Sequence, residues 1–213
     1  MSGLIHYVID TETSGLSTDM HELIEISVIR CSDKMQITRI VKADYPQNAS
    51  YDALKITNKS VRDLYNGISK QQMVEEVNNF FDTDEKTPSH RCVIAHNASF
   101  DRRFLHTTWQ KCNAFFPADL WLDTIQIGKQ AAKKMNMPKA KMNLSAALDL
   151  FGIKKVGREH SAKGDSQNTY LLWKKFEEIN EDFLPLIKSF PHQPPPQEDN
   201  DEDMNALLED LDR

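Results

Sequence analysis

Apolar residues in this chain form short runs near its start and helical stripes further along. Residues 4–10 are almost continuously apolar, which is typical of a central strand covered on both faces. Residues 22–32 and 35–43 are rich in Ile and Val and partly alternate with polar residues. These three closely spaced runs predict an antiparallel meander at the beginning of the chain.

The rest of the pattern predicts helices with two short buried strands among them, at residues 91–96 and 119–124. Helical spacing predicts helices over 60–67, 70–82, 99–112, 124–135, 143–151 and 165–180. Strands first, then helices and strands in alternation, indicate an α/β domain. We therefore expect a mixed sheet of about five strands flanked by helices.

The character of the chain changes near residue 191, where a Pro-rich stretch predicts a stiff extended spacer. We expect one domain over residues 1–185, followed by a spacer and acidic tail over 186–213. The last ten residues, 204–213, carry Met and Leu at helical spacing. This segment is either a short helix that folds onto a protein partner or a solubilising disordered tail.

Composition limits the class of protein. The chain has 213 residues, of which 39% are hydrophobic, and contains no run of about 20 apolar residues that would predict a membrane span. The N-terminus lacks the pattern of a signal peptide. Three cysteines without CxxC spacing are typical of reduced thiols. We expect a cytoplasmic protein that does not bind a membrane.

The net charge of −6 is unevenly distributed. The last sixteen residues hold eight acids and one Arg, a charge of −7, which leaves +1 on residues 1–197. The acidic total therefore does not exclude a nucleic-acid substrate.

Two acids end the first predicted strand. Asp10 and Glu12 are two apart, and residues two apart on a strand project to one face. Their carboxylates should converge just before the turn that Gly15 permits. From these residues alone, a strand running out into solvent is an equally good interpretation.

A second candidate feature follows the strand at 91–96, which delivers His96 and Asn97 to its end. Asn97 is expected to be the N-cap of the next helix. Asp101 lies one helical turn further, on the side that faces back to the strand end. Taken separately, an acid in the first turn of a helix simply suits the helix dipole.

A third feature is Asp165 at the start of a strongly patterned helix, with His160 five residues earlier. On one continuous helix these side chains would point about 140° apart. We therefore expect His160 on a mobile loop, which Gly157 and Gly164 would make easier to form. A lone histidine is more often a surface side chain. Together, however, the three features present four carboxylates and one imidazole at the ends of elements.

The three motifs occur as DTETSG (10–15), HNASFD (96–101) and HSAKGD (160–165). In this order the chain resembles the DnaQ-like 3′–5′ exonucleases of the DEDD superfamily, in the histidine variant (DEDDh), whose fold is RNase H-like. The resemblance covers residues 4–178 and extends to exonuclease X and the proofreading epsilon subunit. Lys163 and Gly164 depart from the family pattern, in which apolar or acidic helix formers are more frequent.

The resemblance implies a two-metal phosphodiester hydrolase that uses two Mg²⁺ ions, with Mn²⁺ able to substitute. Asp10 would bridge both ions, and Glu12 and Asp165 would hold the ion that activates water. Asp101 would support the second ion through water, and His160 would be the general base.

The same resemblance implies the substrate contacts. The backbone from Thr11 to Thr13 would contact the terminal 3′-hydroxyl, and Leu16 would wedge beside the terminal base. His96, Asn97 and Phe100 would line the rest of the site. For Leu16 and Phe100, core packing is the alternative interpretation. Stacking and backbone contacts read no sequence, so little base specificity is expected.

The leading functional hypothesis is a 3′–5′ exonuclease that releases nucleoside monophosphates from single-stranded or frayed DNA ends. Within the enzyme class, the alternatives are a proofreading subunit tethered to a polymerase and a small exoribonuclease. A nucleic-acid-binding scaffold without catalysis is the alternative from a different class. The intact set of five catalytic residues argues against it, and the sequence leaves DNA or RNA preference open.

Overall fold

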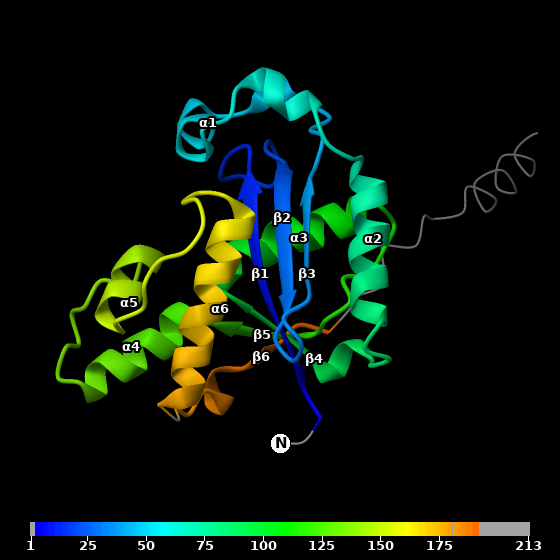
Figure 1. The fold of residues 1–213 in the computed structure, drawn as a ribbon. Coiled ribbons are helices and arrows are strands. Elements are labelled where there is room, and N and C mark those ends of the chain that lie inside the picture. Colours follow the sequence, from blue (N-terminus) through cyan, green and yellow to red (C-terminus); the bar gives the residue numbers. More distant parts are fainter. Residues whose placement is uncertain (1–2, 180, 192–213) are drawn as a thin grey trace, which may run out of the picture.

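A six-stranded mixed sheet forms the centre of the computed structural model, which describes residues 3–179 and 181–191 (Figure 1). The spatial order of the strands is β3-β2-β1-β4-β5-β6. The strands are β1 (Ile5–Thr13), β2 (Leu23–Arg30), β3 (Gln36–Ile40), β4 (Arg91–Ala95), β5 (Leu120–Asp123) and β6 (Lys188–Ser189). The expected meander, β1 to β3, is present, and β1 is parallel to β4 as β4 is to β5.

β1 continues to Thr13, so Asp10 and Glu12 lie within a paired strand and not beyond its end. Glu12 stands opposite Glu25 of β2, and the register of the two strands shifts just after Glu12. Such an irregularity increases the local twist and re-aims side chains. The two acids are therefore held by sheet hydrogen bonds up to the point where the strands diverge.

One strand more than expected is present, because the chain returns to the sheet after α6. β6 pairs with β5, and the amide nitrogen of Phe190 donates to the carbonyl of Asp119 at 2.8 Å. The guanidinium of Arg102 lies 3.8 Å from the centre of the Phe190 ring. The chain thus packs on the domain beyond the boundary expected at 185. The proposed partner-binding segment, 204–213, lies outside the described residues.

Two helical layers enclose the sheet. The helices are α1 (Tyr51–Thr57), α2 (Lys70–Asp82), α3 (Ala98–Lys111), α4 (Thr124–Lys134), α5 (Leu144–Leu150) and α6 (Ala162–Glu178), with 3-10 turns at Pro46–Asn48, Val61–Tyr65, Pro88–His90 and Leu184–Leu186. α2 and α3 cover one face of the sheet, and α4, α5 and α6 cover the other. No helix within the described ranges is long and apolar enough to cross a membrane.

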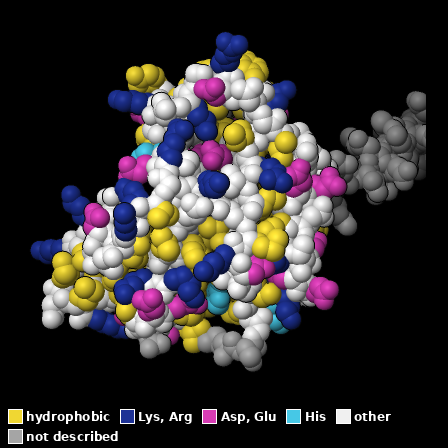
Figure 2. Space-filling model, viewed as in Figure 1, with side chains coloured by type: hydrophobic (Ala, Val, Ile, Leu, Met, Phe, Trp, Pro, Cys, Tyr) yellow, Lys and Arg dark blue, Asp and Glu magenta, His cyan; other side chains and the backbone are white. Residues whose placement is uncertain are grey.

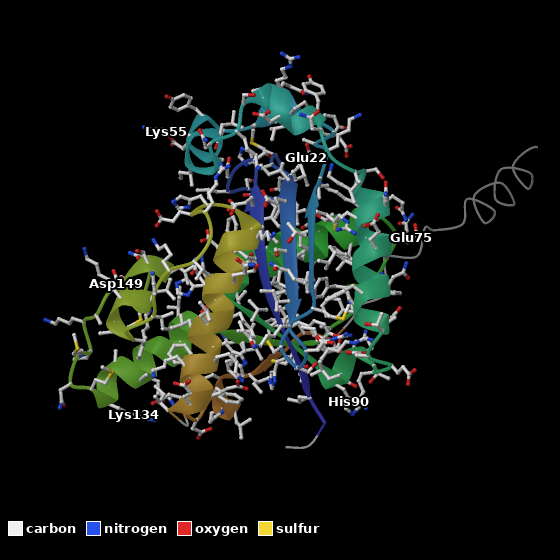
Figure 3. All side chains as sticks on the ribbon, in the orientation of Figure 1. Glu22, Lys55, Glu75, His90, Lys134 and Asp149 are labelled. Atoms are coloured by element: carbon white, nitrogen blue, oxygen red, sulfur yellow. The ribbon has the colours of Figure 1, made fainter. Side chains whose placement is uncertain are left out.

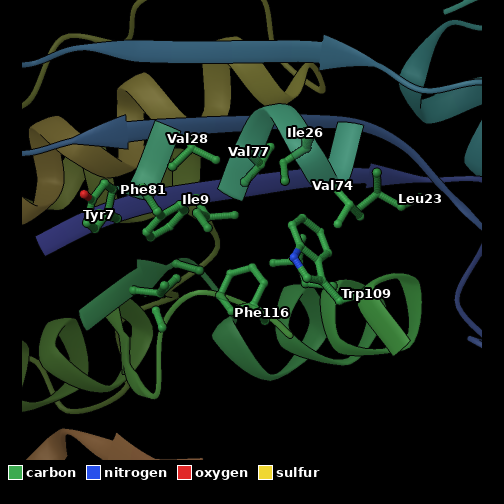
Figure 4. Packing of buried hydrophobic residues seen from close by; sticks show 14 of the residues in the cluster. Tyr7, Ile9, Leu23, Ile26, Val28, Val74, Val77, Phe81, Trp109 and Phe116 are labelled. Atoms are coloured by element: carbon green, nitrogen blue, oxygen red, sulfur yellow. The ribbon is translucent and has the colours of Figure 1, made fainter. Parts of the chain in front are cut away.

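Alternate residues of β1 enter different cores. Tyr7 and Ile9 pack with α2, α3 and the Phe116 ring (Figure 4), whereas Val8 packs with α6 around Trp173. The alternation continues along the strand. Asp10 and Glu12 therefore fall on the Val8 side, which α6 covers.

Two helical predictions need correction. The segment expected as a helix over 60–67 is a 3-10 turn, Val61–Tyr65, and the preceding α1 was not expected. The Ser50 side chain caps α1 by accepting from the amide of Ala53. The last long helix begins at Ala162 and not at Asp165, because Ser161 caps it by accepting from the amide of Gly164.

Candidate active site

Three carboxylates from two distant segments converge at the end of the sheet. One oxygen from each of Asp10, Glu12 and Asp165 lies within 4.8 Å of the others, and all three residues are half-buried. β1 supplies the first two and the first turn of α6 supplies the third. The first and third sequence motifs therefore meet, as the sequence predicts.

A buried hydroxyl pair sets the position of α6 beside the acids. Ser166 donates its hydroxyl proton to Oγ of Ser27 at 2.9 Å, and both side chains are fully buried. Ser27 lies directly opposite Asp10 in the strand register. Ser166 follows Asp165 in the chain, so this contact holds the start of α6 beside the strands that carry the acids. The sequence signal for this contact is a serine within the apolar run of β2.

Asp101 stands beside the three-carboxylate group and is oriented by β1. Its Oδ1 accepts from the amide of Thr11 at 3.0 Å and from the Thr11 hydroxyl at 2.8 Å. The aspartate is buried at the start of α3. The second motif is therefore joined to the first through a residue adjacent to Asp10.

Burial, and for two of the acids the charge of neighbouring carboxylates, raises the pKa values of this cluster. The pKa of Asp10 is raised well above its usual range by burial, and then by the charges of Asp101 and Glu12. Burial, followed by the charge of Asp165, raises the pKa of Glu12 to about 8. Burial also raises the pKa of Asp101, to about 7. Clustered hard oxygen donors with unbalanced negative charge fit a divalent cation.

A buried salt bridge, which no sequence motif indicates, adjoins Glu12. Glu25, opposite Glu12 on β2, is buried and pairs with Nζ of Lys59 at 3.0 Å. Lys59 follows α1 and lies 34 positions after Glu25 in the chain. Only the tertiary fold brings them together. Among the described residues, Glu25 adds a further carboxylate charge that raises the pKa of Glu12, while Lys59 lowers it.

His160 lies outside the helix, as expected from its spacing to Asp165. Its backbone is left-handed, with φ of +52°, and its amide donates to Oδ2 of Asp165 at 3.1 Å. The residue is exposed. Burial raises the pKa of Asp165, and the nearby charge of His160 acts in the opposite direction.

Residues of the β1–β2 turn differ in exposure. Thr13 is buried and its hydroxyl donates to the carbonyl of Gly15 at 2.7 Å, whereas Leu16 is 76% exposed. Leu16 is therefore not a core residue. A side chain at Gly15 would place its Cβ 2.4 Å from the His21 ring. Close approach, and not an unusual backbone angle, explains the glycine.

His96 lies at the end of β4, where its ring links three segments. Nδ1 lies 2.8 Å from the hydroxyl of Thr124 and Nε2 lies 2.8 Å from the carbonyl of Met142. The carbonyl can only accept, so Nε2 carries the proton. Burial lowers the pKa of this histidine.

Asn97 occupies the N-cap position of α3, as predicted, but its side chain makes no capping hydrogen bond. Its backbone is left-handed, with φ of +75°, and its amide donates to Oδ1 of Asp123 at 3.2 Å. The left-handed angle turns the side chain away from the helix amides. Phe100 is half-buried, with its ring 5.1 Å from that of Phe104.

α1 covers the end of the sheet at which the acids lie. Figure 3 shows Glu22 and Lys55 at this end and His90 at the other. The amide of Ser50, the residue before α1, donates to the carbonyl of Ser14 at 2.8 Å. In the space-filling view, Lys and Arg side chains gather around the space between α1 and α6 (Figure 2). An anionic polymer would meet these positive charges on its approach.

Comparison with known proteins adds a family to this geometry. The model of the exonuclease family (RNase_T) matches residues 7–173. A PolC-type DNA polymerase III from Halalkalibacterium halodurans is 27% identical over 175 residues, which are 82% of this chain and 11% of the polymerase. The chain thus spans about a tenth of that relative.

Solved structures share the fold. The nuclease domain of 3′hExo, described as a DEDDh family member bound to rAMP, has a TM-score of 0.69 at 17% identity, over 89% of this chain and 98% of that one. Exonuclease X in complex with 5′ overhanging duplex DNA has a TM-score of 0.59 at 18% identity, over 85% and 96%. The exonuclease family model matches residues 7–173, and the chain also carries the three ordered motifs and the mixed sheet. The chain therefore belongs to the exonuclease family.

Proposed function

We propose that this protein is a metal-dependent 3′–5′ exonuclease that releases nucleoside monophosphates from single-stranded or frayed DNA ends. The observation that carries the proposal is the convergence of Asp10, Glu12 and Asp165, with oxygens within 4.8 Å of one another. Asp101 lies beside them on Thr11. Carboxylates placed so closely are unfavourable unless cations lie among them.

Asp10, Glu12 and Asp165 would hold two Mg²⁺ ions, and Asp101 would support one of them from its place beside Asp10. Mn²⁺, which also accepts oxygen ligands, should substitute. Such ions would activate a water molecule and stabilise the leaving oxygen. The raised pKa of Glu12 and of Asp101 supports this assignment, because a cation would relieve the repulsion that keeps these groups protonated.

His160 would act as the general base. An imidazole accepts a proton near neutral pH, and this residue is exposed next to Asp165. Water attacks the terminal phosphorus and its proton passes to the imidazole. The bond from phosphorus to the 3′-oxygen of the preceding nucleotide breaks, and that oxygen takes a proton from solvent, so the terminal nucleotide leaves as a monophosphate and the shortened strand keeps a 3′-hydroxyl.

The substrate end would lie between the β1–β2 turn and α3. Leu16, which is exposed, would wedge beside the terminal base, and the backbone from Thr11 to Thr13 would contact the 3′-hydroxyl. The amide of Thr11 already donates to Asp101, so the amides that follow it are the better candidates. Phe100 and Asn97 would line the other side, and His96 would support them through its bonds to Thr124 and Met142.

Two alternatives have specific support. The PolC-type relative favours a proofreading role beside a polymerase, for which residues 204–213 would bind a protein partner. The 3′hExo domain bound to rAMP favours an exoribonuclease. Both alternatives use the same acid cluster, so only the polymer or the partner distinguishes them.

The test is a time course with 5′-labelled DNA and RNA oligonucleotides in Mg²⁺ or Mn²⁺. Stepwise shortening from the 3′ end is expected, and none in EDTA. Asp165→Asn and Asp101→Ala should lower the rate roughly a hundredfold or more. Asp149→Asn, an exposed acid on α5 (Figure 3), is the matched control and should cleave normally.

Each failure has a distinct meaning. If neither polymer is shortened, the proposed function is wrong. If the first products are internal fragments, the enzyme is an endonuclease and the 3′–5′ assignment is wrong. Full activity of Asp165→Asn would refute the assignment of the acid cluster.

A further inference from the structure

Arg158 joins two segments that are far apart in the sequence. Its Nη2 donates to the backbone carbonyl of Thr57 at 2.8 Å, which links the loop before α6 to the last residue of α1. The partners are 101 positions apart. A guanidinium that donates to a carbonyl forms a charge-assisted hydrogen bond, which is stronger than a neutral one. Arg158 is only two residues from His160.

A close backbone contact holds the same loop on its other side. A Cβ on Gly164 would lie 2.2 Å from the carbonyl oxygen of Arg158, and a Cβ on Gly157 would lie 3.0 Å from Cα of Gly164. Gly157 is also left-handed, with φ of +69°. The two glycines were expected to loosen the loop. In the structure they let its backbone pack against the first turn of α6.

Three further contacts hold the loop and α1, the two elements that Arg158 connects. Oγ of Ser161 donates to the carbonyl of Arg158 at 2.8 Å while it caps α6. On the far side, α1 is tied to the sheet by the bond from Ser50 to Ser14 and by the salt bridge that adjoins Glu12. The loop therefore rests between two elements that are each anchored beside the acid cluster.

We propose that Arg158 is a positioning residue that clamps this loop between α1 and α6, so that His160 stands beside Asp165. The proposal rests on the proposed role of His160 as the general base. Arg158 acts through the loop and does not touch the reacting atoms. The competing explanation is that Arg158 binds a phosphate of the substrate directly.

Two variants break the clamp from opposite sides. Arg158→Ala removes the hydrogen bond to Thr57. Gly164→Ala displaces the backbone of Arg158 but leaves its guanidinium in the protein. Misplacement of a catalytic group by about 1 Å can cost a hundredfold, so both variants should lower kcat roughly ten- to a hundredfold. KM should change by less than about threefold, since ground-state binding is not the lost interaction.

Two further substitutions serve as a rescue and a control. Arg158→Lys keeps a donor that can reach the carbonyl and should recover most of the lost kcat. Lys163→Ala removes an exposed cation from the same turn of α6 as Gly164 and should behave as wild type. An equal loss in Lys163→Ala would show that positive charge, and not loop position, matters.

Hydrogen exchange in residues 152–161 of the metal-free protein gives a readout that does not require catalysis. Exchange should be faster in Arg158→Ala and Gly164→Ala than in wild type and in Lys163→Ala. Unchanged exchange would overturn the clamp even if kcat falls. If wild type cleaves no oligonucleotide, the proposed function fails, while the exchange experiment still decides whether Arg158 holds the loop.

The phosphate explanation predicts a different set of results. Arg158→Ala would raise KM and reduce the salt dependence of binding by about one unit of slope, and Gly164→Ala would retain full kcat. That combination would overturn the proposal. Circular dichroism checks that each variant is folded. If Gly164→Ala does not fold, Arg158→Ala and Arg158→Lys still distinguish the two explanations, because Arg158 is exposed and its substitution disturbs no core.

Discussion

At the level of single residues, the acid cluster combines burial with closely spaced carboxylates, which does not favour stability. Burial raises the pKa of Asp10, Glu12, Asp101 and Asp165, and the charges of the other cluster carboxylates raise the pKa of Asp10 and of Glu12 further. Perturbed pKa values of this kind concentrate at functional sites. The Ser166–Ser27 and Thr11–Asp101 hydrogen bonds keep the carboxylates close despite their repulsion.

The raised pKa values predict how the stability of the metal-free protein depends on pH. In the unfolded chain Glu12 loses its proton near its ordinary pKa of 4.5, whereas in the folded protein it keeps the proton up to about pH 8. Between these values the folded state binds more protons, so its stability falls as pH rises. The Tm measured in EDTA should therefore decrease from about pH 5 to pH 8.

Glu12→Gln removes one contribution to this slope and should raise the Tm in EDTA at pH 8 relative to wild type. Mg²⁺ should raise the Tm of wild type more at pH 8 than at pH 5, because the cation competes with protons for the same oxygens. Glu75→Gln, an exposed acid on α2, is the control and should match wild type. A Tm that is constant or rises over this interval would refute the charge balance described for the site.

At the level of elements, α1 was not predicted from the sequence, yet it and its flanking residues contact the β1–β2 turn, β2 and the loop before α6. It was not predicted, because its seven residues have no clear apolar stripe. The helix and its flanking residues nevertheless make three contacts near the acids. Ser50 donates to the turn after β1, Lys59 pairs with Glu25, and the carbonyl of Thr57 accepts from Arg158. The stability of α1 therefore comes from tertiary contacts and not from its own sequence.

Lys59→Met tests the contact between α1 and β2. The substitution leaves Glu25 buried without a partner and opposite Glu12, which should cost roughly 1–3 kcal/mol of unfolding free energy. Urea unfolding at pH 7.5 measures this loss. Lys55→Met, on the exposed face of α1, is the matched control and should change the unfolding free energy by less than about 0.5 kcal/mol.

The double variant Glu25→Gln with Lys59→Met should recover part of the lost stability, since the buried charge is then gone. A double variant as unstable as Lys59→Met alone would show that the cost arises from lost packing of the lysine stem. In that event the salt bridge would not be the link between α1 and the sheet.

At the level of the whole molecule, the described chain closes on the sheet at its last residues. A chain that ends after Pro191 keeps β6 and the Arg102–Phe190 contact, and should unfold like the full chain and cleave oligonucleotides at the same rate. A chain that ends after Ile187 loses both and should lose roughly 1–2 kcal/mol. Its Tm should be lower by about 2–8 °C.

Calorimetry and the oligonucleotide assay check this pair of truncations. Equal Tm values for the two chains would show that β6 adds nothing to stability. If the chain ending after Pro191 still co-purifies with every partner of the full chain, the proposed partner-binding role of residues 204–213 is wrong.

Several features of this protein follow from its sequence alone, because they depend on local patterns. Three closely spaced apolar runs, rich in Ile and Val, identify the meander, and the helical stripes identify α2, α3 and α4. The three ordered motifs identify the family, and the five-residue spacing places His160 outside α6. Such features require only the geometry of one strand or one helix.

The tertiary structure alone decides what depends on contacts between distant segments. The pairing of Lys59 with Glu25, the clamp from Arg158 to Thr57 and the return of β6 join residues from 34 to 101 positions apart in the sequence. No local period records such a contact, because each one depends on a partner in another segment of the chain. Gly164 shows the same difference, since its neighbours in sequence suggest a loose loop, whereas the backbone packed against it requires a residue without a side chain.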